Sequence, residues 1–335
     1  MLALAFAANG EYIVGGGNGV EVGVWRVEDG KQMARLAANY VLCLGVSKDG
    51  RWIAAGTACS DVIMWDAKTF EKVFSHNEDG CIINDVDFSP DSTRLVNASE
   101  NGTATVWNVM THKKVQTLDH KGYMITAKYS VQGDRIATAT YNSVRVWDND
   151  DGRLLVDIPV NVTPYCNNCL LWCNNHLFVA SGSTIKKLEP STGSTVSEWP
   201  FRHASDATCM ALPEHGEFIA HSTEEAVTFW DTLTHAQLGL IQPSQCIYSI
   251  ALSPDDQFLV TGGDGGKITV RNLSPIIVSI SLAHLNNFLI PLVFRNRIQS
   301  HCLVDIPLSR NLTFRSTALR SNHGSTISSR TRTRY

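Results

Sequence analysis

The sequence predicts an all-β fold, because three regularities together point to a repeated unit of short strands. The first is a series of tryptophans that each end an apolar or β-branched run: Trp25, Trp65, Trp107, Trp147 and Trp230. The last interval is about twice as long as the others, and Leu188 lies close to its midpoint. Arg271 follows Trp230 at the single interval, so seven units of about 41 residues fill positions 1–285.

The second regularity is a series of tight turns that runs in step with the tryptophans. The turns are SKDG at 47–50, SPDS at 89–92, SVQG at 130–133, CNNH at 173–176, PEHG at 213–216 and SPDD at 253–256. Their Pro, Asp, Asn and Gly residues suit hairpin connections. The third regularity is the pair of apolar runs around each turn, such as 82–88 and 94–99. We therefore expect four short antiparallel strands in each unit, and little helix.

Together, the period, the turns and the tryptophan positions resemble the WD40-repeat family over residues 1–285, most of the chain. Three units carry the signature dipeptide: Trp65-Asp66, Trp147-Asp148 and Trp230-Asp231. Four units depart from it: Trp25-Arg26, Trp107-Asn108, Leu188-Glu189 and Arg271-Asn272. The resemblance implies a seven-bladed β-propeller of four-stranded antiparallel blades, followed by a basic irregular tail at 286–335.

In the WD40-repeat family, a hydrogen-bond network of His, Ser/Thr, Asp and Trp often braces a blade. The resemblance implies a position for each of these residues in every unit. Only His120 and His203 fill the histidine position. The aspartate position, six places before the tryptophan, holds other residues throughout: Gly19, Cys59, Asn101, Tyr141, Gly182, Glu224 and Gly265. No unit carries the full set, so we expect the blades to rely on packing and backbone pairing.

Charge is distributed unevenly along the 335 residues, whose formal net charge is −4. Residues 286–335 contain eight Arg, no Lys and the single acid Asp305, which gives +7 and leaves −11 for the rest. An acidic body argues against a propeller that binds nucleic acid. The Arg- and Ser/Thr-rich tail is expected to be disordered, and it offers weak nucleic-acid contact through 295–335 or phosphorylation sites. The alternative is a tail without a selected role.

One apolar segment, residues 273–294, is long enough to span a membrane. It also contains two prolines, His284, Asn286 and Asn287, which are costly in hydrocarbon. We expect a strand at 276–282 and a connector instead, and no membrane contact. The N-terminus lacks a basic region before its short apolar run, so the sequence predicts a cytoplasmic protein with reduced thiols, a nuclear location being the alternative.

A cluster of potential metal ligands occurs at Cys166, Cys169, Cys173 and His176, and four such ligands would suit zinc. The repeat alignment favours another interpretation, because Cys169 shares a column of small side chains with Cys43, Asp85, Thr126, Cys209 and Ser249. We therefore expect no bound metal, no cofactor and a buried Cys169.

Catalytic and nucleotide-binding motifs are absent from the sequence, which contains no GxSxG, HExxH or P-loop pattern. The glycine-rich run 15–19 joins two strands of a hairpin and leads into no helix that would hold a phosphate. The resulting hypothesis is a non-enzymatic protein–protein interaction scaffold. The alternatives are an RNA-associated scaffold that acts through the tail and, third, a propeller enzyme.

Candidate partner-binding residues lie six positions before the end of each first strand, where the chain enters a blade from a loop: Tyr40, Ile82, Tyr123, Cys166, Asp206 and Cys246. Aromatic and aliphatic groups at one rim are typical of binding hot spots. The alternative is packing of these side chains against the neighbouring blade.

Closure of the ring is the last expectation. The first strand-like unit begins at the first residue, so we expect 276–282 to form the outer strand of the seventh blade. Blade one would then meet blade seven by face packing alone.

Overall fold

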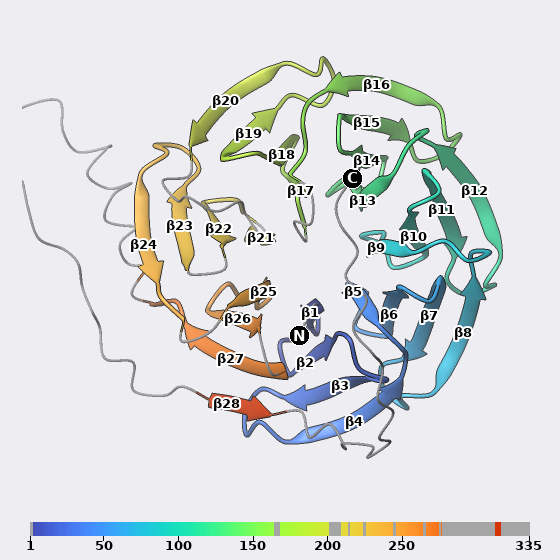
Figure 1. Ribbon diagram of the computed structural model, residues 1–335, viewed down its shortest axis with the longest axis vertical. Helices are drawn as coiled ribbons and strands as arrows, with labels where there is room; N and C mark the ends of the chain where they lie inside the picture. Colours follow the sequence, from blue (N-terminus) through green and yellow to red (C-terminus); the bar gives the residue numbers. More distant parts are fainter. Residues whose placement is uncertain are drawn as a thin grey trace, which may run out of the picture.

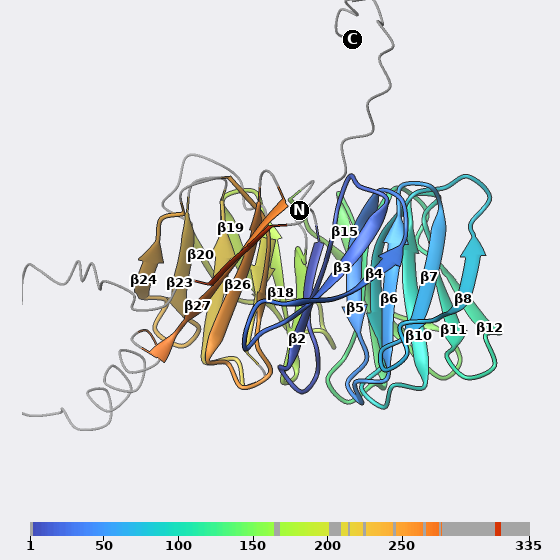
Figure 2. The ribbon, with the colours of Figure 1, turned by 90° about the horizontal axis from the view of Figure 1, so that it is seen from below.

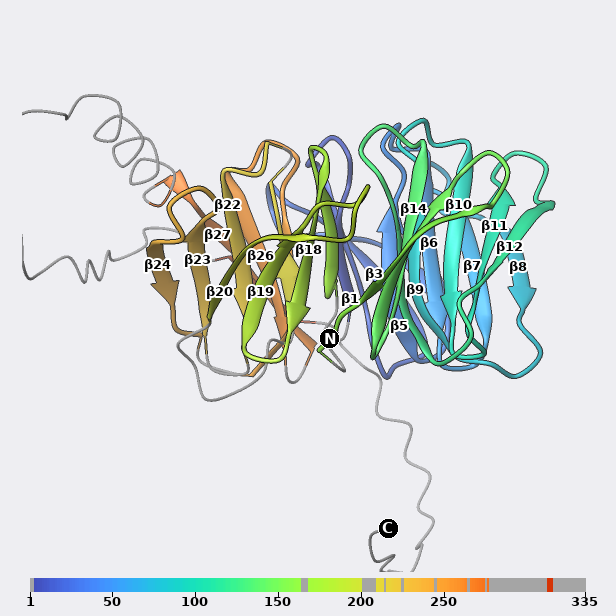
Figure 3. The ribbon, with the colours of Figure 1, turned by 90° about the horizontal axis from the view of Figure 1, so that it is seen from above.

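The computed structural model describes residues 3–163, 168–200, 209–213, 215–223, 226–243, 246–263, 266–274, 276 and 312–315. They form seven antiparallel sheets of four strands each, arranged as blades around a central axis (Figure 1). The predicted all-β, seven-bladed propeller is therefore confirmed. In the two side views, the strands of every blade run between the same two faces (Figures 2 and 3).

The first four blades follow one another without interruption, and each takes its strands in sequence order. Blade one contains β1 (Ala3–Phe6), β2 (Tyr12–Gly16), β3 (Glu21–Arg26) and β4 (Gln32–Ala37). Blade two contains β5 (Val41–Val46), β6 (Trp52–Thr57), β7 (Asp61–Asp66) and β8 (Lys72–Asn77). Blade three contains β9 (Ile83–Phe88), β10 (Arg94–Ser99), β11 (Thr103–Asn108) and β12 (Lys114–Asp119). Blade four contains β13 (Met124–Tyr129), β14 (Arg135–Thr140), β15 (Ser143–Asp148) and β16 (Leu154–Pro159).

The last three blades include the two units that lack the tryptophan. Blade five contains β17 (Leu170–Cys173), β18 (His176–Ser181), β19 (Thr184–Leu188) and β20 (Thr195–Pro200). Blade six contains β21 (Cys209–Ala211), β22 (Phe218–Ser222), β23 (Val227–Asp231) and β24 (Gln237–Ile241). Blade seven contains β25 (Ile247–Leu252), β26 (Phe258–Gly263), β27 (Lys267–Asn272) and β28 (Leu312–Arg315). The positions of Leu188 and Arg271 on third strands confirm the period inferred from the sequence.

Each first strand begins on one face of the propeller and ends on the other. We call the face with the loops before the first strands, including Tyr40 and Tyr123, the entry face. We call the opposite face, with the turns after the first strands such as 47–50 and 89–92, the hairpin face. Serines organise these turns: Ser47 Oγ donates to Asp49 Oδ1 at 2.6 Å and accepts from the Trp52 N–H at 2.9 Å.

The signature dipeptide has a local structural role. A shift in the strand register immediately precedes the tryptophan, as between Met64 and Trp65. The following Asp66 accepts the N–H groups of Lys68 and Thr69 at 2.9 and 2.8 Å, so its carboxylate holds the turn into the outer strand. These backbone hydrogen bonds lower the pKa of Asp66. Asp148 and Asp231 hold the equivalent turns in blades four and six.

Apolar side chains fill the spaces between adjacent blades. Val24, Ile53 and Trp65 belong to one buried cluster that joins blades one and two. Trp52, Val86 and Trp107 belong to the next, between blades two and three. Because each blade buries its apolar faces only against its neighbours, the ring derives its stability from the contacts of successive repeats.

Blade seven corrects two expectations about the C-terminal segment. Its outer strand is β28, which pairs antiparallel with β27 from Lys267↔Arg315 to Val270↔Leu312. It is not 276–282: Ile276 lies in a helical turn, where its N–H donates to the Leu273 carbonyl at 2.8 Å. The Ile276 side chain packs against the buried cluster of blades six and seven, which explains its apolar character. Residues 312–315 of the predicted disordered tail thus belong to a blade, while 277–282 lie outside the described residues.

The junction of blades one and seven agrees with the expected face packing. Leu4, Phe6 and Trp25 of blade one form a cluster with Val260 and Ile268 of blade seven. Among the described residues, no helix is long and apolar enough to cross a membrane. Most of the apolar segment 273–294 lies outside those residues.

Candidate interaction surfaces

Tyr40 occupies the loop that leads into blade two, on the entry face. Its φ of 50° is left-handed, and its backbone is fixed on both sides. The N–H donates to the Gly19 carbonyl and the C=O accepts from the Ala58 N–H, both at 2.9 Å. The side chain is 52% exposed. A large aromatic group thus projects from a backbone that is held by two neighbouring loops.

Tyr123 occupies the equivalent place before blade four and is 38% exposed. Its ring stacks on Tyr141, with the ring centroids 5.3 Å apart and the planes at 16°. Its hydroxyl group lies 3.5 Å from Oδ1 of Asn84. Asn84 in turn donates from Nδ2 to the Met124 carbonyl at 2.7 Å and so connects blades three and four. Asn84 could not be recognised from the sequence, because an isolated polar residue within a strand gives no repeat signal.

The other predicted partner-binding residues divide into two groups. Ile82 and Cys246 are half-buried at the same entry position of blades three and seven. Cys166 and Asp206 lie outside the described residues, as does His203. The structure therefore brings four of the six predicted residues to one face, and the two tyrosines are the exposed members.

Tryptophan indoles are braced by polar side chains in some blades. Trp107 Nε1 donates to Asn97 Oδ1 at 2.7 Å in blade three. Trp230 Nε1 donates to His221 Nδ1 at 3.3 Å in blade six. In blade four, Trp147 Nε1 donates to Thr138 Oγ1 at 2.8 Å.

The hydrogen-bond network in blade four is larger than the sequence predicts. His120 bonds through Nδ1 to Thr138 Oγ1 at 2.8 Å and through Nε2 to Ser143 Oγ at 2.9 Å. The expectation that the blades rely on packing and backbone pairing is therefore wrong for blade four, and the hydrogen bonds of Trp107 and Trp230 correct it for blades three and six. A serine four places before Trp147 replaces the aspartate sought six places before it. Burial, followed by the charge of Arg145, lowers the pKa of His120 to about 4.

The cysteine column lies in the interior, and the predicted burial of Cys169 is confirmed at 0% exposure. Burial raises the pKa of Cys169 and of Cys209 to about 12, so both thiols stay protonated. Cys173 and His176 point to different neighbours. The Cys173 sulfur occupies the space that a Cβ at Gly216 would need, whereas His176 Nε2 lies 3.9 Å from Glu189 Oε2.

Metal-ligating groups do not converge in the described part of the chain, where no three His, Cys, Asp or Glu side chains are placed to hold an ion. Cys166, the first residue of the suspected zinc cluster, lies outside that part.

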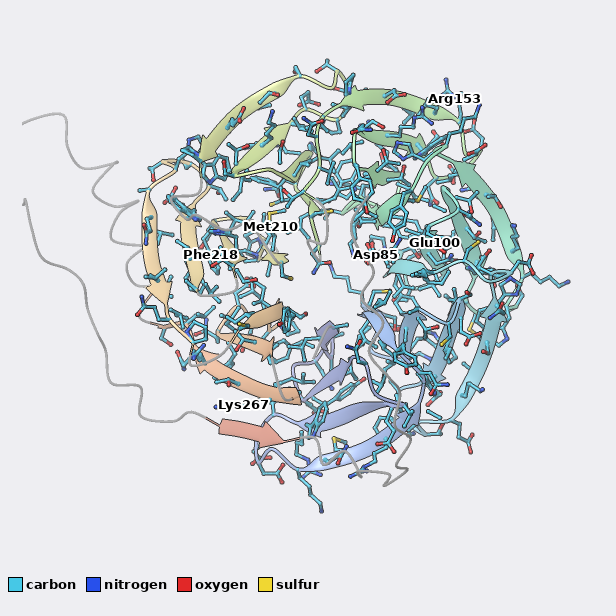
Figure 4. The ribbon with its side chains drawn as sticks, viewed as in Figure 1. Asp85, Glu100, Arg153, Met210, Phe218 and Lys267 are labelled. Carbon is cyan, nitrogen blue, oxygen red and sulfur yellow. The ribbon has the colours of Figure 1, made fainter. Side chains whose placement is uncertain are left out.

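Three charged residues lie together at the central channel, where Figure 4 shows Asp85 on the innermost strand of blade three. Asp85 Oδ1 pairs with Lys128 Nζ of blade four at 2.9 Å, and both side chains are largely buried. Thr126 donates its hydroxyl hydrogen to Asp85 Oδ2. The repeat column of small side chains predicted the position of Asp85 in its blade. It did not predict that a charged residue there would pair with Lys128. The carboxylates of Asp85 and Asp87 raise the pKa of Lys128 against the opposing effect of burial.

Asp87, two places farther along β9, accepts the Tyr129 N–H at 2.8 Å. Burial raises the pKa of Asp87 to about 6, although the charge of Lys128 and the Tyr129 hydrogen bond act in the opposite direction. A cavity of about 480 Å³ adjoins Asp87, and residues from all seven blades line it.

Comparison with known proteins identifies the class to which this fold belongs. The model of the "WD domain, G-beta repeat" family matches residues 30–66, 68–108 and 237–272. The solved structure "Crystal structure of RRP9 WD40 repeats" is similar over 78% of this chain and 86% of that one, with a TM-score of 0.71 and 17% identity. "Structure of U3-55K" is similar over 78% and 88%, with a TM-score of 0.70 and 17% identity. The matched repeats and the seven four-stranded blades agree, so the chain contains WD40 repeats and its fold matches that of the WD40-repeat family.

Curated relatives share this region at low identity. "U3 small nucleolar RNA-associated protein 15 homolog" of Xenopus laevis is 23% identical over 236 residues, 68% of this chain and 45% of the relative. "WD repeat-containing protein 18" of Danio rerio is 24% identical over 72% of this chain and 60% of the relative. "Transcription factor unc-37" of Caenorhabditis elegans is 24% identical over 70% and 39%. The chain spans about half the length of the curated relatives it matches.

Proposed function

We propose that this protein is a non-enzymatic scaffold for protein partners, and that its entry face makes the contact through Tyr40 and Tyr123. The observation that carries the proposal is the exposed Tyr40 ring on a backbone held by Gly19 and Ala58. Tyrosine offers a large amphipathic contact area at a small entropic cost. A backbone fixed before binding reduces that cost further.

Tyr123 supports the same face in a different way. Its stacking on Tyr141 limits ring motion while 38% of the side chain remains accessible. The resulting pair presents a preformed aromatic surface, which is typical of the anchor residues of protein interfaces. Ile82 and Cys246 would form less exposed contacts on the same face.

The cellular setting we infer is a nuclear RNA-processing assembly. A cytoplasmic location, expected from the sequence, has no support among the relatives. Three relatives and one similar solved structure carry U3 small nucleolar RNA or U3 in their names. Other relatives have different names, such as "Transcription factor unc-37" and "Protein groucho". The protein partner itself therefore has to be found by experiment.

The test of the scaffold proposal is partner capture with the full chain and single substitutions. Tyr40→Ala and Tyr123→Ala should each weaken partner binding by about 1–2 kcal/mol, as truncation of anchor residues does, with little change in melting temperature. Met110→Ala is the matched control, because Met110 is 62% exposed in a turn of the hairpin face. Sharply lower melting temperatures in both tyrosine variants, with unchanged binding by the folded fraction, would identify the rings as structural.

RNA binding through the tail is a second candidate, supported by the eight arginines of 286–335 and by the U3-associated relatives. We propose that 1–285 form the propeller and 286–335 the tail, with Leu312–Arg315 joining blade seven. Deleting the tail would remove β28, so the sharper variant replaces Arg320, Arg330, Arg332 and Arg334 by Gln. Loss of RNA binding with unchanged partner capture would support this role, and unchanged RNA binding would contradict it.

A further inference from the structure

The central channel contains a cavity of the size of a binding pocket. Its volume of about 480 Å³ lies within the range of roughly 300–1,000 Å³ that is usual for such sites. Apolar side chains from several blades form much of its wall: Phe6, Phe88, Leu171, Trp172, Leu212 and Leu252. Pro90, Pro213 and Pro254, which also line it, belong to the turns of the hairpin face. This cavity is therefore separate from the tyrosines of the entry face.

Two carboxylates lie near the one buried ammonium group of the cavity, that of Lys128. Lys128 pairs with Asp85 at 2.9 Å, so these two charges compensate each other. Asp87 then remains as a half-buried carboxylate that accepts the Tyr129 N–H at 2.8 Å. Lys48 also contributes to the lining, but it lies on an exposed turn where solvent screens its charge. The interior thus offers apolar side chains around two carboxylates, Asp85 and Asp87, that share the one buried ammonium group of Lys128.

We propose that this cavity binds a lysine or arginine side chain of a partner protein, which enters from the hairpin face and pairs with Asp87. The aliphatic stem of such a side chain suits the apolar wall while its cationic head seeks a partner. A charge-assisted hydrogen bond to a partly desolvated carboxylate is stronger than one between neutral groups. The net charge of −11 outside the tail would also attract basic segments toward the propeller.

This proposal rests on the scaffold function in one respect: the lysine or arginine side chain belongs to a partner protein. It can be tested without the partner, by calorimetric titration of the full chain with Ac-Gly-Lys-Gly-NH2 and Ac-Gly-Arg-Gly-NH2. We expect saturable binding of both peptides at one site, and no binding of the neutral Ac-Gly-Gln-Gly-NH2. Absence of peptide binding would not contradict the proposed role of the entry-face tyrosines, because the tyrosine variants are tested separately by partner capture.

Asp87→Asn should weaken the binding of both cationic peptides about tenfold or more, because it removes the charge and keeps the side-chain shape. Asp150→Asn is the matched control: it removes the same charge from an exposed turn of the hairpin face and should leave the affinity unchanged. Circular dichroism of both variants checks that the fold is retained.

Several results would overturn the proposal. These are equal affinity of Asp87→Asn and the wild type, equal losses in Asp87→Asn and Asp150→Asn, no saturable binding of either cationic peptide, or preferential binding of Ac-Gly-Glu-Gly-NH2 through Lys48 and Lys128. The arginines of the chain's own tail are an internal source of the same cation. If the variant with Gln at 320, 330, 332 and 334 bound the peptides much more tightly, the tail and not a partner would fill the cavity.

Discussion

Blade one and blade four have the same strand order but hold their tryptophans by different means. In blade four, Thr138 Oγ1 lies 2.8 Å from both Trp147 Nε1 and His120 Nδ1. The position equivalent to Thr138 in blade one is Gly15, which offers no side-chain oxygen. Trp25 instead covers Gly23 so closely that a Cβ there would collide with the ring.

This difference shows that the tryptophan position of a WD40 blade can be stabilised by directional hydrogen bonds or by close packing. Trp25 lies in an apolar cluster with Ile13 and with residues of blade seven. Trp147 lies in another with Met124 and Ile136. Both indoles are buried, at 2% and 6% exposure. The hydrogen bonds in blade four depend on the protonation of His120 and on the hydroxyl group of Thr138. The packing of Trp25 in blade one depends on the absence of a side chain at Gly23.

The largest effect is expected from Thr138→Val in blade four. The substitution leaves the Trp147 N–H and a nitrogen of His120 buried without a partner, at about 1–3 kcal/mol for each such group. The free energy of unfolding should fall by about 2–4 kcal/mol in urea denaturation. Thr261→Val is the control, because Thr261 occupies the equivalent position on β26 of blade seven, where Arg271 stands in place of the tryptophan, and the substitution should cost less than about 1 kcal/mol. Equal losses would show that the hydrogen bonds of blade four are unimportant.

A smaller loss is expected from Gly23→Ala in blade one. The new methyl group would collide with the Trp25 ring, and overpacking of this kind costs about 1–3 kcal/mol. Gly239→Ala is the control, since the nearest atoms there lie 3.5 Å from the added Cβ, an ordinary contact. Thermal unfolding of both variants compares them directly. Equal melting temperatures of Gly23→Ala and Gly239→Ala would contradict the claim that packing of Trp25 on Gly23 stabilises blade one.

The smallest expected effect is a pH dependence of the free energy of unfolding that arises from His120 in blade four. Burial lowers the pKa of His120 to about 4, so the unfolded chain binds this proton more readily than the folded protein. Stability should therefore fall as the pH drops from about 6.5 to 4, by about 1–2 kcal/mol. The pKa of Asp87 is raised to about 6. Protonation of this carboxylate therefore increases the stability of the folded protein as the pH falls from about 6 toward the ordinary pKa of an aspartate, which is opposite to the effect of His120.

The comparison with His120→Gln isolates the histidine, because the contribution of Asp87 is the same in both proteins. Urea denaturation of wild type and variant at several pH values gives the difference in stability. The difference should shrink as the pH falls toward 4. A constant difference would mean that His120 is not the group that titrates.

Periodicity predicted the seven blades because the repeat places Trp65, Leu188 and Arg271 at the same point of the third strand. It could not predict β28, because pairing of the last strand is not encoded by local spacing. Leu312–Arg315 follows β27 only after a connection far longer than the turns of the other blades. Periodicity instead favoured Ile276, whose apolar side chain is used for packing.

The candidate sites were predictable only where a residue repeats. The entry-face column located Tyr40 and Tyr123, since the repeat supplies the same position in successive blades. The channel pair of Asp85 and Lys128 was missed because it depends on two neighbouring blades, each contributing a residue that the other blades lack at that position. Ser143 was missed because the aspartate of the family network was sought at a different spacing.

The most direct test of the central claim, that the entry face binds the protein partner, is site-specific photo-crosslinking in cells. A photoreactive phenylalanine analogue would replace Tyr40, Tyr123 or, on the hairpin face, Met110 in the full chain. We predict that positions 40 and 123 crosslink to the same partner protein and that position 110 does not. Crosslinking of that partner from position 110, with none from 40 or 123, would contradict the account.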